Sequence, residues 1–199
     1  MSDTKLIERL ERLEAEVGEL RAKQEITEVL YRASRAVDRC DVEMMASCWH
    51  PGGTDYRGVA NGPAEYTRNS LKNWPVTVSR HVNANITIEL DGDVARVESY
   101  VDAFHYFPEQ RDGKGQHEFI QARYMDRFEK RNGAWKIARR ITVWDRSWIE
   151  PSHESWYDFA SGAYVTDKHF IMGRRDKQDV VYHFRLPPEL QHHEPNAKY

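Results

Sequence analysis

The amino-acid sequence predicts an α+β fold in which helices pack on one face of a mostly antiparallel sheet. Apolar residues recur with helical periodicity over roughly the first fifty positions, and from Val82 onward they alternate with the two-residue period of strands. The dipeptides Asp91-Gly92 and Asn132-Gly133 separate alternating runs, which is typical of β-hairpin turns. A chain of 199 residues is long enough for one such domain with additional segments at its ends.

The N-terminal segment, residues 1–22, is predicted to form an amphipathic helix. Its apolar residues are spaced alternately by four and three positions, as in the seam of a coiled coil. These residues are Leu6, Leu10, Leu13, Val17 and Leu20. About two heptads are too short for a stable isolated helix, so the stripe should pack on its own domain, as a flap, or on a partner chain. We favour the partner chain and expect a homo-oligomer, either a dimer or a trimer.

Helical periodicity continues from Ile26 to Val37, pauses at residues 38–41 and resumes over 42–48, which predicts two linked helices. Tyr31, Ser34 and Asp38 are spaced so that they share one helix face, and this face could look into a cavity. The sequence of residues 49–53 should break the helix, and a short strand is expected over 54–57. Pro63 suits the first turn of a further helix that runs to about residue 73.

Four strands are expected in the second half of the chain, over residues 82–90, 94–107, 117–130 and 135–145. Within the second of these strands, Tyr100, Asp102 and Phe104 must face the side opposite to His105. Residues 147–199 are rich in Asp, His, Pro and aromatic residues and have weak periodicity, so we expect an extended C-terminal arm. The predicted organisation is an N-terminal helix (1–22), a central domain (23–146) and a C-terminal extension (147–199).

Composition excludes several classes of function. The net charge is -3, and 29 basic residues are interspersed among 32 acidic ones, so we expect no nucleic-acid partner. The mean hydropathy is -0.80 and no apolar stretch could span a bilayer, so a soluble protein is expected. The two cysteines and the lack of an apolar leader favour the cytoplasm. The histidines have no metal-ligand spacing and no nucleotide-binding loop is present, so neither a metal nor a cofactor is predicted.

The residues most suggestive of chemistry are Asp38, at the end of a helical pattern, and His81, at the start of a strand pattern. A carboxylate that holds a histidine in one tautomer makes the other ring nitrogen a better base. Each residue also has an ordinary structural interpretation, since Asp38 could cap a helix and His81 could be a hydrogen-bonded edge residue. Together they predict general acid-base catalysis without a cofactor.

The order of several short motifs resembles the NTF2-like, SnoaL-like superfamily, in particular its cofactor-independent dehydratases and lyases such as scytalone dehydratase. The resemblance covers about residues 20–146 and rests on residues 37–41 (VDRCD), 55–57 (DYR), 79–81 (SRH), 86–88 (ITI) and 132–137 (NGAWKI). It implies a cone-shaped barrel, in which helices pack on a strongly curved, mostly antiparallel sheet around one deep apolar pocket.

The resemblance also implies roles for individual residues. It places the catalytic dyad of the family at Asp38 and His81, a tyrosine that orients a substrate oxygen at Tyr56, and a second histidine at His105. Tyr124 occupies a position where these enzymes have a polar substrate contact. The remaining candidate substrate-binding residues, not implied by the resemblance, are Tyr31, Trp49, Trp144 and Arg146, and the last three could belong to the core instead of the mouth of a pocket. Val37 stands where scytalone-type enzymes have a tyrosine, so their device of two tyrosines for polarising a carbonyl is incomplete here.

These expectations favour a cofactor-independent lyase that acts on a small, hydrophobic, aromatic alcohol. His81 would remove a proton, His105 would protonate a departing hydroxyl, and Tyr56 or Tyr31 would stabilise developing charge on oxygen. Aromatic residues of the C-terminal extension could roof a cavity for a two-ring substrate; they are Trp148, Trp156, Tyr157, Phe159 and Tyr164.

The specific substrate that this layout favours is a lignin-derived 1,2-diarylpropane-1,3-diol. The chain resembles bacterial lyases that convert such compounds to a stilbene with loss of water and formaldehyde. Two alternatives remain open. One is a non-catalytic NTF2-like module for small-molecule binding or assembly, and the other is a steroid or polyketide isomerase or cyclase that uses a carboxylate base.

Overall fold

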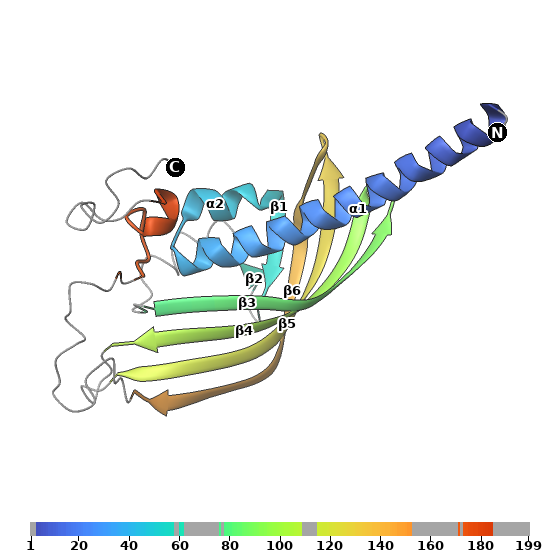
Figure 1. Cartoon of the computed structure of the whole chain (residues 1–199). Helices are drawn as coiled ribbons and strands as arrows, with labels where there is room; N and C mark the ends of the chain where they lie inside the picture. The colour runs from blue at the N-terminus through green and yellow to red at the C-terminus, as the bar shows by residue number, and fades with distance from the viewer. Residues whose placement is uncertain are drawn as a thin grey trace, which may run out of the picture.

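A long helix lies across one face of a strongly bent sheet in the computed structural model, which describes residues 3–57, 60–61, 76, 78–108, 115–152, 171 and 173–184 (Figure 1). The helices are α1 (Asp3–Asp38), α2 (Val42–Ser47) and the short 3-10 helix η3 (Val180–Tyr182). The strands are β1 (Trp49–Tyr56), β2 (Ala60–Asn61), β3 (Val78–Asp91), β4 (Val94–Phe107), β5 (Gln116–Arg131) and β6 (Ala134–Pro151).

The six strands form one sheet in the order β2-β1-β6-β5-β4-β3. Strands β3 to β6 form an antiparallel meander, and β1 joins its far edge by pairing parallel to β6. Helix α1 contacts β3 and β6 and covers one face of the sheet, which we call the interior face; the opposite side is the outer face (Figure 1). The predicted α+β fold class, with helices on a curved and mostly antiparallel sheet, is confirmed.

The predicted strands are all present, and four of them are longer than expected. The hairpin turns lie where the sequence placed them, and their residues Gly92, Asn132 and Gly133 have positive φ angles. Glycine and asparagine adopt this conformation at low cost, which is why such dipeptides mark hairpins. Strand β1 begins at Trp49 rather than at residue 54, because it pairs with Ile137 of β6 from its first residue. The helix expected from Pro63 to about residue 73 lies outside the described residues.

Three β-bulges change which side chains face inward. In β3 the bulge lies between Ala84 and Thr87, where Asn85 has a φ of 48°. In β6 one extra residue lies between Ile137 and Arg139 and another between Trp144 and Arg146, as the pairing with β5 shows. Each extra residue inverts the alternation of faces along its strand and increases the local bend of the sheet.

The apolar core lies between the C-terminal half of α1 and the part of the interior face nearest the β3-β4 and β5-β6 hairpins. Its largest fully buried side chains are Ile26, Leu30, Phe128 and Ile137. Further along the same face, towards the other end of β4, buried residues become polar. They include Ser99, His105 and Asp126. A core at one end of the sheet therefore leaves a polar interior at the other end.

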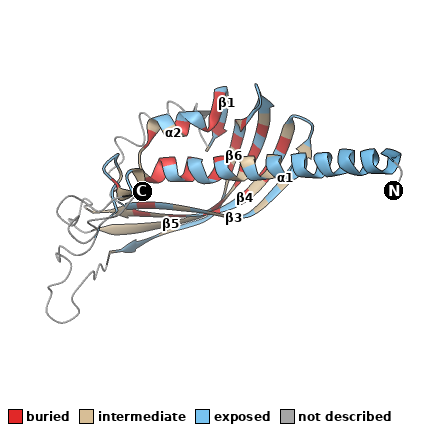
Figure 2. Ribbon diagram, turned by 45° about the horizontal axis from the view of Figure 1, so that its top comes forward, coloured by how far each residue is buried: buried red, intermediate tan, exposed pale blue. Residues whose placement is uncertain are grey.

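Helix α1 is a single continuous helix that joins the predicted N-terminal segment to the first helix of the domain. Its residues from Ile26 to Asp38 pack on the sheet, whereas residues 3–21 are all exposed and project beyond it (Figure 2). The stripe from Leu6 to Leu20 thus does not fold back on its own domain, and the flap alternative is wrong. No helix in the described part of the chain is long and apolar enough to cross a membrane.

Candidate active site

Asp38 and His81 form a direct hydrogen bond at the polar end of the interior. The Nδ1 atom of His81 lies 2.8 Å from Oδ1 of Asp38, and the backbone N–H of His81 donates to Oδ2 at 3.0 Å. The side chains are only 9% and 13% exposed. Because the carboxylate accepts from Nδ1–H, the Nε2 atom of His81 is left as the basic nitrogen of the neutral ring.

Ser79 completes the hydrogen bonding of this carboxylate. Its hydroxyl donates to Oδ1 of Asp38 at 2.9 Å and it is buried. Ser79 and His81 are two residues apart in β3, so both face the interior. The carboxylate therefore accepts from one hydroxyl, one backbone N–H and one imidazole, and these three donors fix its orientation.

The end of α1 is built so that Asp38 points towards β3. The N–H of Asp41 donates to the carbonyl of Ala36, and the N–H of Cys40 donates to that of Val37. Together with the left-handed conformation of Cys40, φ 52°, this is a Schellman motif. Asp41 then caps α2 by accepting from the N–H of Met44 at 3.0 Å.

A second histidine-carboxylate pair faces the first. His105 is 2% exposed, and its Nδ1 lies 2.9 Å from Oε2 of Glu118. Ser79, His105 and Glu118 occupy directly paired positions on β3, β4 and β5, so they form one cross-strand row on the interior face. The ring centroids of His81 and His105 are 5.3 Å apart. Two oriented imidazoles this close together can act on the same small reacting group.

Electrostatics favours the neutral form of His81. Burial lowers the pKa of His81 below its ordinary value of 6.5, and the positive charge of Arg57 acts in the same direction. The Asp38 carboxylate opposes this effect but does not outweigh it. His81 is thus unprotonated near neutral pH, as a general base must be.

Residues 173–184 of the C-terminal extension lie against the turn that carries Asp38. Arg175 donates to three backbone carbonyls, those of Val37 at 3.2 Å, Asp38 at 3.3 Å and Val76 at 2.6 Å. Around this contact, Asp179 pairs with Arg39, and Lys177 and Tyr182 both bind the carboxylate of Asp41. We call residues 173–184 the C-terminal clamp, because they hold the end of α1 from outside the sheet.

Polar side chains continue along the interior face beyond the two histidines. Asn83 donates to the hydroxyl of Ser34 on α1 and accepts from that of Ser99 on β4. Tyr124 is 6% exposed and stacks on the guanidinium of Arg140, 3.7 Å from its ring centroid. This polar lining is suited to a ligand that carries hydroxyl groups as well as rings.

The structure places the predicted residues on different faces. Asp38, His81, His105 and Tyr124 all belong to the interior. Trp144 also faces inward, because it pairs with the buried Ala122, yet it is 52% exposed.

Tyr56 lies on the face of β1 opposite to the buried Asp55 and is 53% exposed. Tyr31 is 52% exposed, whereas Ser34 and Asp38, which were expected to share its helix face, are buried. Roles for these two tyrosines in substrate contact remain predictions.

Two assignments require correction. Arg146 pairs with Gln121 on the outer face, and its guanidinium stacks on the Trp148 ring 4.8 Å from the centroid. The bulge between Trp144 and Arg146 inverts the alternation, so Arg146 and Trp148 cannot reach the interior from this strand. Trp49 is 5% exposed and packs in the apolar core, so it does not line a ligand site.

Sequence reasoning missed Ser79, Glu118 and Arg175. Ser79 could have been found, since a residue two positions from His81 in a strand must share its face. Glu118 could not have been found, because its contact with His105 depends on the register between β4 and β5. Arg175 lies far from Asp38 in the sequence and only tertiary packing brings them together. The aromatic residues 156, 157, 159 and 164 lie outside the described residues.

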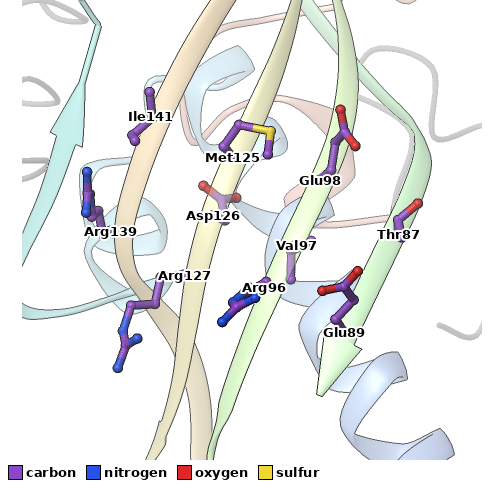
Figure 3. A pocket seen from close by; sticks show the side chains of 10 residues that line it. All are labelled: Thr87, Glu89, Arg96, Val97, Glu98, Met125, Asp126, Arg127, Arg139 and Ile141. Atoms are coloured by element: carbon purple, nitrogen blue, oxygen red, sulfur yellow. The ribbon is translucent and has the colours of Figure 1, made fainter. Parts of the chain in front are cut away.

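A hollow of about 410 Å³ lies on the outer face of the sheet, behind the part of the interior face that carries the apolar core (Figure 3). Arg96, Arg127 and Arg139 lie in one cross-strand row along it, and Glu89 and Glu98 are close by. This mixture of charges is typical of a solvated sheet face. In the described part of the chain, no three His, Cys, Asp or Glu residues cluster in a way that could hold a metal ion.

Solved structures share this fold at low sequence identity. A protein of Novosphingobium aromaticivorans, described provisionally as a scytalone dehydratase, is 21% identical with a TM-score of 0.57, over 65% of this chain and 87% of that chain. A type 2 hexachlorocyclohexane dehydrochlorinase is 21% identical with a TM-score of 0.59, over 75% and 99%. The type 3 dehydrochlorinase of Novosphingobium barchaimii is 19% identical with a TM-score of 0.57, over 69% and 94%. At such identities the likeness shows the fold alone.

No curated protein sequence matches the chain. The family model described as the SnoaL-like domain matches residues 18–141, which is more than half of the chain. The matched range contains both histidines, the two carboxylates that bind them and Ser79. This chain therefore belongs to the SnoaL-like domain family.

Proposed function

We propose that the protein is a cofactor-independent lyase that eliminates water from a hydrophobic aromatic alcohol. The observation that carries this proposal is the buried hydrogen bond between Asp38 and His81, with His105 facing them at a centroid distance of 5.3 Å. A module that used the cone only for binding or assembly would have no need of a desolvated, oriented base. Solvent-exposed or apolar residues at these positions would have favoured such a module instead.

The two imidazoles can divide the work of an elimination. His81 is held by Asp38 with its lowered pKa, so it accepts a proton from the substrate. The Glu118 carboxylate binds Nδ1 of His105 and orients its ring, so we assign His105 the role of proton donor to a departing hydroxyl. General acid-base help of this kind accelerates a reaction by about a hundred- to ten-thousand-fold.

For the specific substrate we propose a 1,2-diarylpropane-1,3-diol with a para-hydroxyl group on the ring next to the benzylic alcohol. Loss of the phenolic proton and of the benzylic hydroxyl, which leaves as water, gives a quinone methide. Removal of the primary-alcohol proton then breaks the adjacent carbon–carbon bond and releases formaldehyde. The electron pair of that bond forms the stilbene double bond and restores the aromatic ring, and the phenoxide takes up a proton.

The polar interior fits this substrate class in its chemistry. Two aromatic rings need apolar or stacking surfaces, which Tyr124 and the inward-facing Trp144 could supply. The hydroxyl groups of the substrate need hydrogen-bonding partners, which the row of Ser79, His105 and Glu118 could supply. The lignin-derived origin of the substrate, a homo-oligomeric state and a cytoplasmic location remain predictions.

The decisive experiment incubates purified protein, without added metal or nucleotide, with the diol. Stilbene absorbance and formaldehyde are measured together for the wild type and for His81→Ala, Asp38→Asn and His105→Ala. The exposed Lys130, at the end of β5 remote from Glu118 and His105, supplies the matched control Lys130→Ala. Equal amounts of both products from the wild type and the control, but not from the three site variants, would support the proposal.

Other outcomes distinguish the alternatives. If Asp38→Asn abolishes turnover while His81→Ala retains it, the carboxylate itself is the base, as in an isomerase or cyclase. If folded protein forms neither product, the diarylpropane substrate is wrong and other dehydration substrates must be screened. If no substrate is turned over but a two-ring phenol binds with equal affinity to all variants, a binding module is favoured.

A further inference from the structure

The projecting half of α1 carries an apolar stripe that no described part of the domain covers. Leu6, Leu10, Leu13, Val17 and Leu20 are between 42% and 67% exposed. They share one side of a helix that is continuous with the packed half of α1 (Figure 2). A contiguous apolar stripe of this kind on an exposed helix marks an interaction surface.

The spacing of the stripe defines a heptad register. Leu10 and Val17 fall at a positions, and Leu6, Leu13 and Leu20 fall at d positions. A β-branched residue at a with leucine at d favours two-stranded coiled coils over larger ones. The pattern becomes polar at the next a position, Gln24, shortly before the helix meets its own sheet. The stripe therefore ends where the domain begins.

We propose that a second copy of this chain pairs with residues 6–21 as a parallel, in-register, two-stranded coiled coil. In this alignment every apolar residue of the stripe meets the same residue of the second copy. Leu6, Leu10, Leu13, Val17 and Leu20 then form consecutive core layers, and none of them faces a polar residue.

The charged residues beside the stripe agree with this alignment. In a parallel coiled coil, a residue at g lies next to the e residue five positions later on the other helix. Arg9 at g would meet Glu14 at e, and Glu16 at g would meet Arg21 at e. Both pairs are of opposite charge, and two-fold symmetry makes each of them occur twice.

Antiparallel alignments use the same residues less well. If Leu10 faces Leu13 of the second copy, Leu20 lies opposite Asp3. If Leu10 instead faces Leu20, Leu6 lies opposite Gln24 and the two copies of Glu16 approach each other. Of these three alignments, only the parallel one places an apolar residue opposite every residue of the stripe. It also brings opposite charges together at both g–e contacts between charged residues.

The first test measures the mass of the full-length protein by sedimentation equilibrium over a range of concentrations. The wild type should reach twice the chain mass of 23.4 kDa and dissociate on dilution. Leu13→Glu should be monomeric, because it buries a carboxylate in the central core layer. Glu11→Lys, on the exposed b position, is the matched control and should dimerise like the wild type. A wild type that stays monomeric, a trimeric mass, or a dimer that survives Leu13→Glu would overturn the proposal.

A second test distinguishes the two orientations. The double variant Arg9→Glu, Glu16→Arg places like charges in both parallel g–e contacts, so the dimer should dissociate. In the antiparallel alignment with Leu10 facing Leu13, residues 9 and 16, both at g, meet across the two helices. The double variant exchanges their charges but keeps them opposite, so an antiparallel dimer should survive. Adding Glu14→Arg and Arg21→Glu should restore the parallel dimer. Circular dichroism checks that the helix content is unchanged, since Glu16→Arg also removes the 3.9 Å pair with Arg12.

Discussion

The guanidinium of Arg175 donates to the backbone carbonyl of Asp38 at 3.3 Å, although the two residues are 137 positions apart. The same side chain binds the carbonyls of Val37 and Val76. The last carbonyls of a helix have no partners within it, and a cation beside them is favoured by the helix dipole. The C-terminal clamp thus fixes the helix end from which the Asp38 carboxylate reaches His81.

We predict that Arg175→Met lowers kcat by on the order of a hundredfold with a smaller change in KM. The variant keeps both residues of the Asp38–His81 pair but removes the hydrogen bonds of residue 175 that hold the end of α1. The carboxylate should then no longer hold the imidazole in one orientation. Steady-state kinetics on the active substrate measures the effect. Arg174→Met is the matched control, since the Arg174 side chain forms its ion pair with the exposed Asp176 at the surface of the clamp. An unchanged kcat in folded Arg175→Met would show that the clamp does not position the dyad.

The pH dependence of activity should have an acidic limb below the ordinary histidine value of 6.5. Burial lowers the pKa of His81, so the ring stays neutral and basic until the pH falls well below neutrality. The limb is measured as kcat/KM against pH and compared with the titration of the His81 ring by NMR. A limb centred above 6.5 would contradict the assignment of His81 as the base.

The same lowered pKa predicts a direction for stability. Below about pH 6.5 the unfolded chain takes up a proton at this histidine that the folded protein does not, so stability falls as the pH decreases through that value. His81→Gln should remove this part of the pH dependence. Denaturant unfolding of both proteins at several pH values measures it, and parallel pH profiles for the two would contradict the prediction.

Glu118→Gln should impair substrates that need protonation of their leaving group more than substrates that do not. The Glu118 carboxylate lies 2.9 Å from Nδ1 of His105 and orients its ring through a charge-assisted hydrogen bond, whereas a neutral amide would bind it more weakly. An alcohol should therefore lose on the order of a hundredfold in kcat, and an analogue with a halide or aryloxide leaving group much less. Equal losses on both substrates would mean that Glu118 acts on the structure rather than on proton donation.

The sequence was sufficient to predict the fold and to select Asp38 and His81 as a candidate pair. Period changes and hairpin dipeptides depend on local chemistry, so the order of helices and strands could be predicted. Asp38 and His81 were selected because the sequence marks the end of a helical pattern and the start of a strand pattern; in the structure Asp38 ends α1 and His81 lies within β3.

The remaining parts of the site depend on features that have no local signal. A bulge of one residue moved Arg146 to the outer face, although its strand was predicted correctly. Glu118 meets His105 only because of the register between two strands. Trp49 was assigned to a ligand site by its type, but packing on α1 and β6 places it in the core. Register, bulges and long-range packing are set by the whole fold, so they cannot be derived from one segment.

The interior also contains a buried ion pair that should dominate the stability of this end of the sheet. Arg140 binds Asp126 through two hydrogen bonds of 2.7 Å, and their side chains are only 5% and 0% exposed. Burial alone would lower the pKa of Arg140, but the Asp126 carboxylate outweighs it and holds the guanidinium charged. Removing one partner of such a pair leaves an uncompensated charge in a medium of low dielectric constant.

We predict that Arg140→Met lowers the free energy of unfolding by about 3–5 kcal/mol. The double variant Arg140→Met, Asp126→Leu should be considerably more stable than the single one, because no buried charge remains without a partner. Arg127→Met is the matched control: its pair with Glu129 lies on the exposed outer face and should contribute less than about 1 kcal/mol. Denaturant unfolding at one fixed protein concentration measures all four proteins. If Arg140→Met unfolds within about 1 kcal/mol of the wild type, water must reach Asp126 and this end of the interior is not sealed.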